Sequence, residues 1–240
     1  ATFKQNNLDP GGFAELVRVL PASVERGIFR IPADVTDEEA LFAEPLACCL
    51  RGMRRGNVRS GDTVAILGCG PIGLTHVQLS HIFGAGRVIG VDPIANRVRR
   101  AETLGADVGI AASGVDAVRA VREATAGIGP DIVLNTVGHP EVYEQAFAMV
   151  RAGGHVIFFA ECPPGSHLTL DPTLLCRNEV AVIGSYSPAP DDLPQALDLI
   201  HRREVEVASL ISHRIPLAGL AEAVRLVGSA TESLKIILVP

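Results

Sequence analysis

The sequence has no tryptophan, few other aromatic residues and no run of basic residues. Aromatic residues make up 4% of the chain, and 27 acidic residues outnumber 21 lysines and arginines, which gives a formal net charge of −6. Proteins that bind nucleic acids or anionic membranes usually present lysine and arginine clusters, and single-stranded bases stack on aromatic side chains. The composition therefore argues against nucleic-acid and membrane partners.

Long apolar runs are missing as well. Stretches such as Val156–Ala160 are far shorter than the roughly 18 residues that a membrane span needs. The N-terminal residues Ala1 to Asn7 contain no apolar signal core. The cysteines form no CxxC pair, as is typical of reduced thiols, and lie at Cys48, Cys49, Cys69, Cys162 and Cys176. We therefore expect a cytoplasmic protein.

From Asp62 onward the sequence alternates between short apolar strands and helices. Its 240 residues suffice for one large or two small domains. Strands are predicted at residues 63–67, 87–91, 107–111, 131–136, 155–160 and 179–184. Helices are predicted at residues 72–83, 96–104, 116–126, 140–151 and 193–202, the last capped by Asp191 or Asp192. The strands lack clean alternation of polar and apolar residues, so they predict a six-stranded, doubly wound parallel sheet covered on both faces.

The outer segments are less regular. Residues 12–19 and 27–32 are predicted as short extended pieces joined by loops, followed by a short helix capped near Thr36 or Asp37, with acidic residues in its first turn. The C-terminal segment predicts a strand at 209–215, a helix at 217–227 and a final strand at 235–239.

A glycine-rich turn joins the first predicted strand of the sheet to an apolar helix. It reads Gly68-Cys69-Gly70-Pro71-Ile72-Gly73 and has the GxGxxG spacing. In such a turn the first glycine permits the tight bend, the second lets backbone approach a pyrophosphate, and the third allows close packing of helix and strand. Free N–H groups at the helix N-terminus can then bind phosphate oxygens. We interpret the turn as a dinucleotide-binding site of the Rossmann type.

An aspartate follows the second predicted strand, about twenty residues after the turn, as that fingerprint requires. Asp92 can accept hydrogen bonds from both adenosine ribose hydroxyls, and its charge would repel a 2′-phosphate, so it favours NAD over NADP. Arg97 can pair with Asp92 or lie over the adenine; a solvated helix residue is the alternative interpretation.

Read with their flanks, these residues resemble the zinc-dependent medium-chain dehydrogenase/reductase family, and most closely its sorbitol, threonine and alcohol dehydrogenase branches. The resemblance covers nearly the whole chain. It rests on residues 12–15 (GFAE), 43–47 (AEPLA), 61–73 (GDTVAILGCGPIG), 104–107 (LGAD), 150–154 (VRAGG) and 234–240 (LKIILVP).

The resemblance implies a GroES-like β-rich catalytic domain interrupted by the coenzyme domain. Residues 1–55 would be the last part of the catalytic domain, 56–202 the NAD-binding Rossmann domain, and 203–240 the segment that returns to the catalytic domain. It also implies a homodimer or homotetramer. The residues that it places beside the nicotinamide are Thr136, Val137, Gly138, Ala160 and Glu161, of which Glu161 departs from the small residue usual in the family.

The resemblance further places Glu44 at or near the catalytic zinc. Family members carry a catalytic cysteine and a Gly-His-Glu motif in an N-terminal segment that this sequence does not contain, so we interpret the chain as a fragment or a truncated form. A catalytic zinc needs about three protein ligands, so Glu44 could equally be an ordinary helix-proximal acid. Cys48 and Cys49 point about 100° apart on a helix and are interpreted as core thiols.

These observations predict an NAD(H)-dependent oxidoreductase that transfers hydride between nicotinamide and an alcohol or polyol, assisted by zinc in the complete protein. A catalytically inactive NAD-binding module is one alternative. An S-adenosylmethionine-dependent methyltransferase is another, since such enzymes also use a glycine turn and a later acid, although the GPIG sequence and the LGAD segment argue against it.

Overall fold

A computed structural model describes residues 11–229, 231 and 233–240. The prediction for the first seven residues lies outside this range. The chain forms two compact units: Ala43–Glu206 is one, and the described residues up to Phe42 form the other together with Val207–Pro240. The helix α3 (Ala43–Arg55) thus groups with the sheet. That the outer segments belong to a GroES-like domain stays a prediction.

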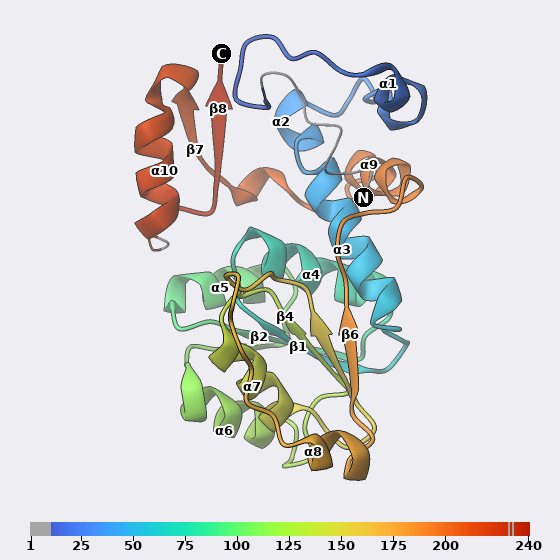
Figure 1. Cartoon of the computed structure of the whole chain (residues 1–240), viewed down its shortest axis with the longest axis vertical. Helices are drawn as coiled ribbons and strands as arrows, with labels where there is room; N and C mark the ends of the chain where they lie inside the picture. The colour runs from blue at the N-terminus through green and yellow to red at the C-terminus, as the bar shows by residue number, and fades with distance from the viewer. Residues whose placement is uncertain (1–10, 230, 232) are drawn as a thin grey trace. The chain divides into compact units, whose positions relative to one another are not determined.

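The larger unit contains a six-stranded parallel sheet in the order β3-β2-β1-β4-β5-β6 (Figure 1). All five strand pairings are parallel and in register. The strands are β1 (Thr63–Leu67), β2 (Arg87–Val91), β3 (Val108–Ile110), β4 (Ile132–Asn135), β5 (His155–Phe158) and β6 (Ala181–Gly184). The predicted doubly wound Rossmann sheet is confirmed, and the strand order reverses between β1 and β4. Ligands of such sheets bind outside the carboxyl ends of the strands at this reversal.

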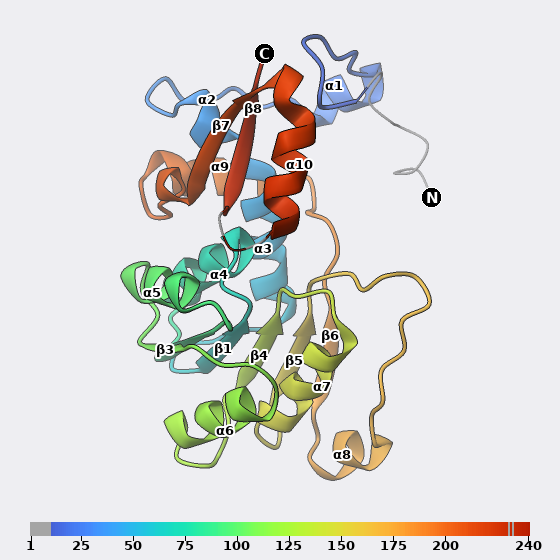
Figure 2. The same cartoon turned by 90° about the vertical axis from the view of Figure 1, so that its left-hand side faces the viewer.

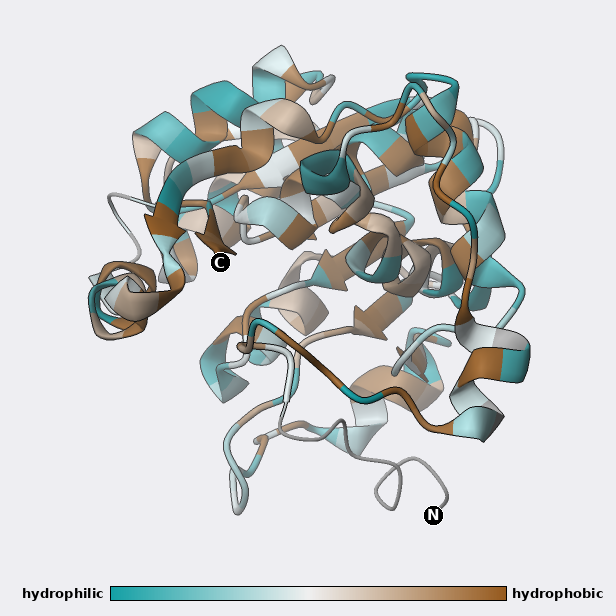
Figure 3. Ribbon diagram, turned by 90° about the horizontal axis from the view of Figure 1, so that it is seen from above, coloured by the Kyte–Doolittle hydropathy of each residue, from teal (hydrophilic) through white to brown (hydrophobic). Residues whose placement is uncertain are grey.

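Helices cover both faces of the sheet. In Figure 1, α4 (Pro71–Ile82) and α5 (Ala95–Thr103) lie above it, and α6 (Gly114–Ala124) and α7 (Pro140–Met149) lie below. Residues Ala65 and Ile89 pack in the core on the α6–α7 side. Their strand neighbours Val64, Ile66 and Val88 are also fully buried. The apolar strands, brown in Figure 3, therefore lack the alternation of a half-exposed sheet because both faces are covered.

The smaller unit has a two-stranded parallel sheet of β7 (Ile211–Pro216) and β8 (Lys235–Val239), with α10 (Leu220–Ser229) beside it (Figure 2). A 3₁₀ turn, η3 (Leu217–Gly219), precedes α10, and another, η2 (Ala208–Leu210), precedes β7. The short helix α2 (Asp37–Ala40) begins where we predicted: Thr36 and Glu39 form a reciprocal capping box.

Some local features were not predicted. Among the described residues, segments 12–19 and 28–32 are irregular, with a single bridge residue at Arg18, and the unpredicted helix α1 (Pro21–Gly27) lies between them. The helix α8 (Pro172–Arg177), which begins with Asp171 as N-cap and Pro172 in its first turn, was not predicted. In α9 (Asp192–His201) the side chain of Asp191 makes no capping bond.

Candidate dinucleotide site

The glycine turn packs tightly against the end of β4. Gly68 has a φ of +91°, and a Cβ there would lie 2.6 Å from both Thr136 Oγ1 and Val137 Cγ2. A Cβ on Gly73 would lie 1.7 Å from the carbonyl oxygen of Gly68. Both positions therefore need glycine for the fold itself, because any side chain would push the turn away from α4 or from β4.

Gly70 is different. Its φ of −72° and ψ of −176° are extended backbone that any residue adopts. A Cβ at this position would meet only Arg97 Nη1, at 3.9 Å. Within the described part of the chain, no hydrogen bond uses the amides of Gly70, Ile72 or Gly73. Open space in front of free amides at a helix N-terminus is the geometry of an anion site, with Pro71 at the first helical position.

Asp92, directly after β2, faces this turn and is 4% exposed. The Cys69 amide donates to its Oδ2 at 2.9 Å, and the Ile94 amide donates to Oδ1 at 2.8 Å. Arg97 Nη1 lies 3.9 Å from Oδ2, so the two side chains form the predicted pair. Each carboxylate oxygen keeps a second acceptor position, as two ribose hydroxyls would require.

The segment after β4 is fixed by its own hydrogen bonds. The Thr136 hydroxyl lies within 3.0 Å of the carbonyl oxygens of Leu67 and Gly68. The Asn135 side chain donates to the Val137 carbonyl at 3.0 Å and accepts from its amide at 2.8 Å. These contacts bring the turn after β1 and the segment after β4 together, as the parallel sheet predicts.

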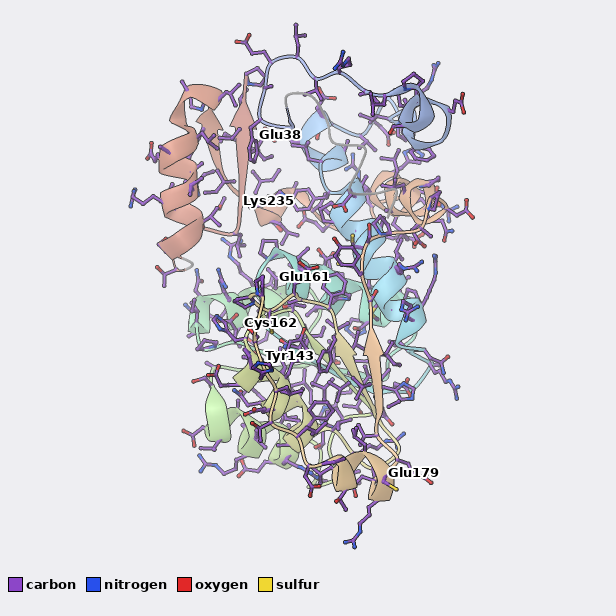
Figure 4. The ribbon with its side chains drawn as sticks, in the orientation of Figure 1. Glu38, Tyr143, Glu161, Cys162, Glu179 and Lys235 are labelled. Atoms are coloured by element: carbon purple, nitrogen blue, oxygen red, sulfur yellow. The ribbon has the colours of Figure 1, made fainter. Side chains whose placement is uncertain are left out.

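The segments after β4 and β5 also touch. A Cβ on Gly138 would lie 2.2 Å from the Glu161 carbonyl oxygen. The Tyr143 hydroxyl of α7 donates to the Ala160 carbonyl at 2.5 Å, and burial raises the pKa of Tyr143 to about 12. Figure 4 shows Glu161 and Cys162 in the segment above Tyr143. The Glu161 side chain is exposed.

Beside Ala160 and Glu161 lies a pocket of about 500 Å³ that also includes residues of α3 and of the segment after β6. Arg51, Ser185 and Tyr186 line it, and the sequence analysis did not identify them. Ser185 directly follows β6, the last strand of the six-stranded sheet, and that position alone could have indicated Ser185 as a site residue. No motif marks Arg51, whose place follows from the packing of α3.

Glu44 lies in the first turn of α3, and none of its contacts joins it to the glycine turn. The Cys48 thiol donates to its Oε1 at 3.2 Å. Burial raises the pKa of Cys48 to about 12 and that of Cys49 well above its ordinary value, so neither is a thiolate. Across the described residues, no three His, Cys, Asp or Glu side chains come together as metal ligands. A zinc ion does not fit these residues by themselves.

Two histidines near the site differ in environment. The ring of His76 on α4 is completely buried, with its centroid 4.8 Å from that of Phe159. Burial lowers the pKa of His76 to about 3, so it stays neutral. His139, just past Gly138, is exposed at the N-cap of α7.

Known proteins with similar sequences are dehydrogenases. Residues 71–202 match the model of the family described as zinc-binding dehydrogenase. An erythritol/L-threitol dehydrogenase from Mycolicibacterium smegmatis is 30% identical over 96% of this chain and 62% of its own length. L-threonine 3-dehydrogenase from Bacillus subtilis is 32% identical over 96% of this chain and 65% of its own length. The chain thus spans less than two thirds of either relative.

Solved structures with a similar fold are dehydrogenases as well. A putative zinc-binding dehydrogenase from Sinorhizobium meliloti, bound to NADP, superposes with a TM-score of 0.86 at 32% identity, over 96% of this chain and 66% of that one. An alcohol dehydrogenase from Thermus gives a TM-score of 0.87 at 28% identity, with the same coverage. No helix in the described part of the chain is long and apolar enough to cross a membrane. From its matched family model and its fold, the chain belongs to the zinc-binding dehydrogenase family.

Proposed function

We propose that this chain is the dinucleotide-binding part of an NAD(H)-dependent dehydrogenase that transfers hydride between nicotinamide and an alcohol or polyol. One observation carries the proposal. Gly70 is a glycine that the fold does not need, placed before free amides and beside a buried carboxylate. A ligand that approaches the backbone closely explains why a side chain is absent there.

The described residues fit a dinucleotide. The amides of Gly70, Ile72 and Gly73 would bind the pyrophosphate, and Asp92 would accept from the adenosine ribose hydroxyls. Asp92 would also disfavour a 2′-phosphate, which makes NAD the proposed cofactor, while Arg97 holds the carboxylate and borders the adenine. Bound NAD supplies a hydride acceptor at nicotinamide C4.

The segments after β4 and β5 are the proposed wall of the nicotinamide site. The close contact of Gly138 with the Glu161 backbone and the Tyr143–Ala160 hydrogen bond hold this wall in one conformation. Rigid backbone at this edge would orient the ring and exclude water from one side. Thr136 and Val137 would border the ring from the β4 side.

The alcohol or polyol class is supported by the names of the relatives, which include erythritol/L-threitol, sorbitol and L-threonine dehydrogenases. We assign no step to zinc, because among the described residues Glu44 has only Cys48 as a partner. Glu44 stays the proposed metal-proximal residue. A homodimer or homotetramer and a cytoplasmic location also remain proposals; all five cysteines are free, as in reducing compartments.

Calorimetric titration of the chain with NADH and, separately, with S-adenosylmethionine tests the cofactor class. We expect NADH to bind at one site per chain and S-adenosylmethionine to give no heat of binding. Binding of S-adenosylmethionine without NADH would replace the proposal with the methyltransferase alternative. Binding of neither would contradict the assignment of Gly70 and Asp92 to a ligand.

A further inference from the structure

The pocket beside Ala160 and Glu161 has a polar lining that the dinucleotide does not explain. It lies where α3 meets the segments after β5 and β6, entirely within the larger unit. Arg55 is fixed at its edge, because its Nε donates to the Gly184 carbonyl at 2.6 Å. Arg51, one helical turn earlier, lines the same pocket.

Two buried polar atoms of this pocket have no partner among the described residues: Arg51 Nε and Ser185 Oγ. Ser185 is 7% exposed, so its hydroxyl is removed from bulk water. Buried polar atoms in folded proteins nearly always have a hydrogen-bond partner. One side chain comes from α3 and the other from the segment after β6, and both can donate to the same acceptor.

The charge of the pocket favours an anion. Arg51 forms no ion pair within the described part of the chain, and the terminal nitrogens of Arg55 make no bond there. The only carboxylate in the lining is that of Glu161, which is exposed and forms no ion pair with either arginine. The pocket lining therefore contains two guanidinium groups and one carboxylate. The exposed side chain of Tyr186 also lines the pocket.

We propose that this pocket binds an oxyanion, a carboxylate or phosphate, through the Arg51 guanidinium and the Ser185 hydroxyl. A planar guanidinium matches such groups with two parallel donors. The inference rests on the proposed function in one respect: the pocket adjoins the proposed nicotinamide wall, so the oxyanion belongs to the substrate. The substrate class is then a sugar acid or a polyol phosphate rather than a neutral polyol.

The test is NMR of the arginine Nε–H groups of the whole chain, titrated with inorganic phosphate, D-gluconate and D-sorbitol. Phosphate and D-gluconate are expected to shift the Arg51 signal. D-sorbitol, which matches gluconate but lacks its carboxylate, is expected to bind at least about tenfold more weakly. Equal affinity for gluconate and sorbitol, or an Arg51 signal that no anion moves, overturns the proposal.

Variants locate the site. Arg51→Gln and Ser185→Ala are each expected to weaken gluconate binding about tenfold, the latter with minimal risk to folding. Arg99→Gln, an exposed arginine on α5, is the matched control and should bind as the unmodified chain does. An equal loss in all three variants would show general charge attraction and overturn the proposal.

A parallel NADH titration separates this inference from the proposed function. Retained gluconate shifts without NADH binding would support the subsite and contradict the dinucleotide role. NADH binding without any anion-induced shift of the Arg51 signal would support the dinucleotide role and contradict the oxyanion subsite. Displacement of gluconate by NADH would assign the oxyanion to the cofactor and overturn the substrate assignment; simultaneous binding is the expected result.

Discussion

The two units of the chain differ in how much each buries. In the larger unit, strands such as β1 and β4 are covered on both faces, and Val64, Ile66 and Leu134 have no exposed surface. In the smaller unit, the cluster around Ile215 and Leu226 is small. Phe13, Leu16, Val24, Ile28, Val224 and Val227 there are exposed. A small core opens at a lower free-energy cost, so we expect the smaller unit to open before the larger one, which holds the candidate site.

The first prediction compares a helical glycine in each unit. Gly73→Ala places a Cβ 1.7 Å from the Gly68 carbonyl, whereas Gly228→Ala on α10 meets nothing within 4 Å. We expect Gly73→Ala to cost about 3 kcal/mol of unfolding free energy and about 6 to 12 °C of melting temperature. Gly228→Ala should be neutral or stabilise by up to about 1 kcal/mol. Equal effects in thermal melts would contradict the packing contrast.

The second prediction separates ligand space from packing space within one turn. Gly70→Val fills the volume in front of the free amides but meets only Arg97 Nη1. We expect NADH binding to be lost, at least about a hundredfold, with a melting temperature within about 3 °C of the unmodified chain. Fluorescence titration measures the affinity for NADH, and thermal melts on the same sample measure the melting temperature. A parallel fall of stability and binding would mean that Gly70 serves the fold.

The third prediction concerns the buried carboxylate. The unmodified chain should bind NADH at least about tenfold more tightly than NADPH, a difference of about 1.4 kcal/mol, because Asp92 opposes the 2′-phosphate. In Asp92→Ser the ratio should fall to within about threefold. Asp92→Asn is the control, since it removes the charge and keeps one acceptor oxygen, for either the Cys69 or the Ile94 amide. Equal affinity for both cofactors in the unmodified chain would refute the role of Asp92.

The fourth prediction concerns the smaller unit, where Arg214 of β7 contacts Glu38 of α2 through two hydrogen bonds of 2.5 Å. These bonds lower the pKa of Glu38 below its ordinary 4.5. The stabilisation is therefore present above about pH 5 and is lost as pH falls through the lowered pKa. Glu38→Gln should melt slightly lower than the unmodified chain at neutral pH, and the gap should close in acid. Glu222→Gln, an exposed acid on α10, is the control for the loss of one surface charge.

The smallest effect is expected at Glu44. Chelator-free protein should contain less than about 0.1 zinc per chain by mass spectrometry, because one carboxylate binds zinc weakly. Glu44→Gln should not change that content, and sorbitol, threonine and simple alcohols should not be turned over. About one zinc per chain with measurable turnover would show that our account of Glu44 is wrong.

Local sequence patterns predicted the larger unit best. β1 and β2 occupy their predicted residues, and the helices of the sheet begin within two residues of their predicted starts. These segments carry strong signals, namely apolar runs bounded by glycine or proline. Segments 12–19 and 27–32 resembled strands in composition but have no strand partner among the described residues, so they do not form a ladder.

The sequence by itself determined the doubly wound parallel sheet and the identity of the phosphate turn, because these depend on local spacing and on covered apolar strands. Only the tertiary structure showed which atoms the glycines meet: a Cβ on Gly68 would meet Thr136 and Val137, whereas one on Gly70 would meet only Arg97 Nη1. It alone placed Arg51 and Ser185 in one pocket. These residues are 134 positions apart, and only the packing of α3 beside β6 makes them neighbours, which no local pattern in the sequence encodes.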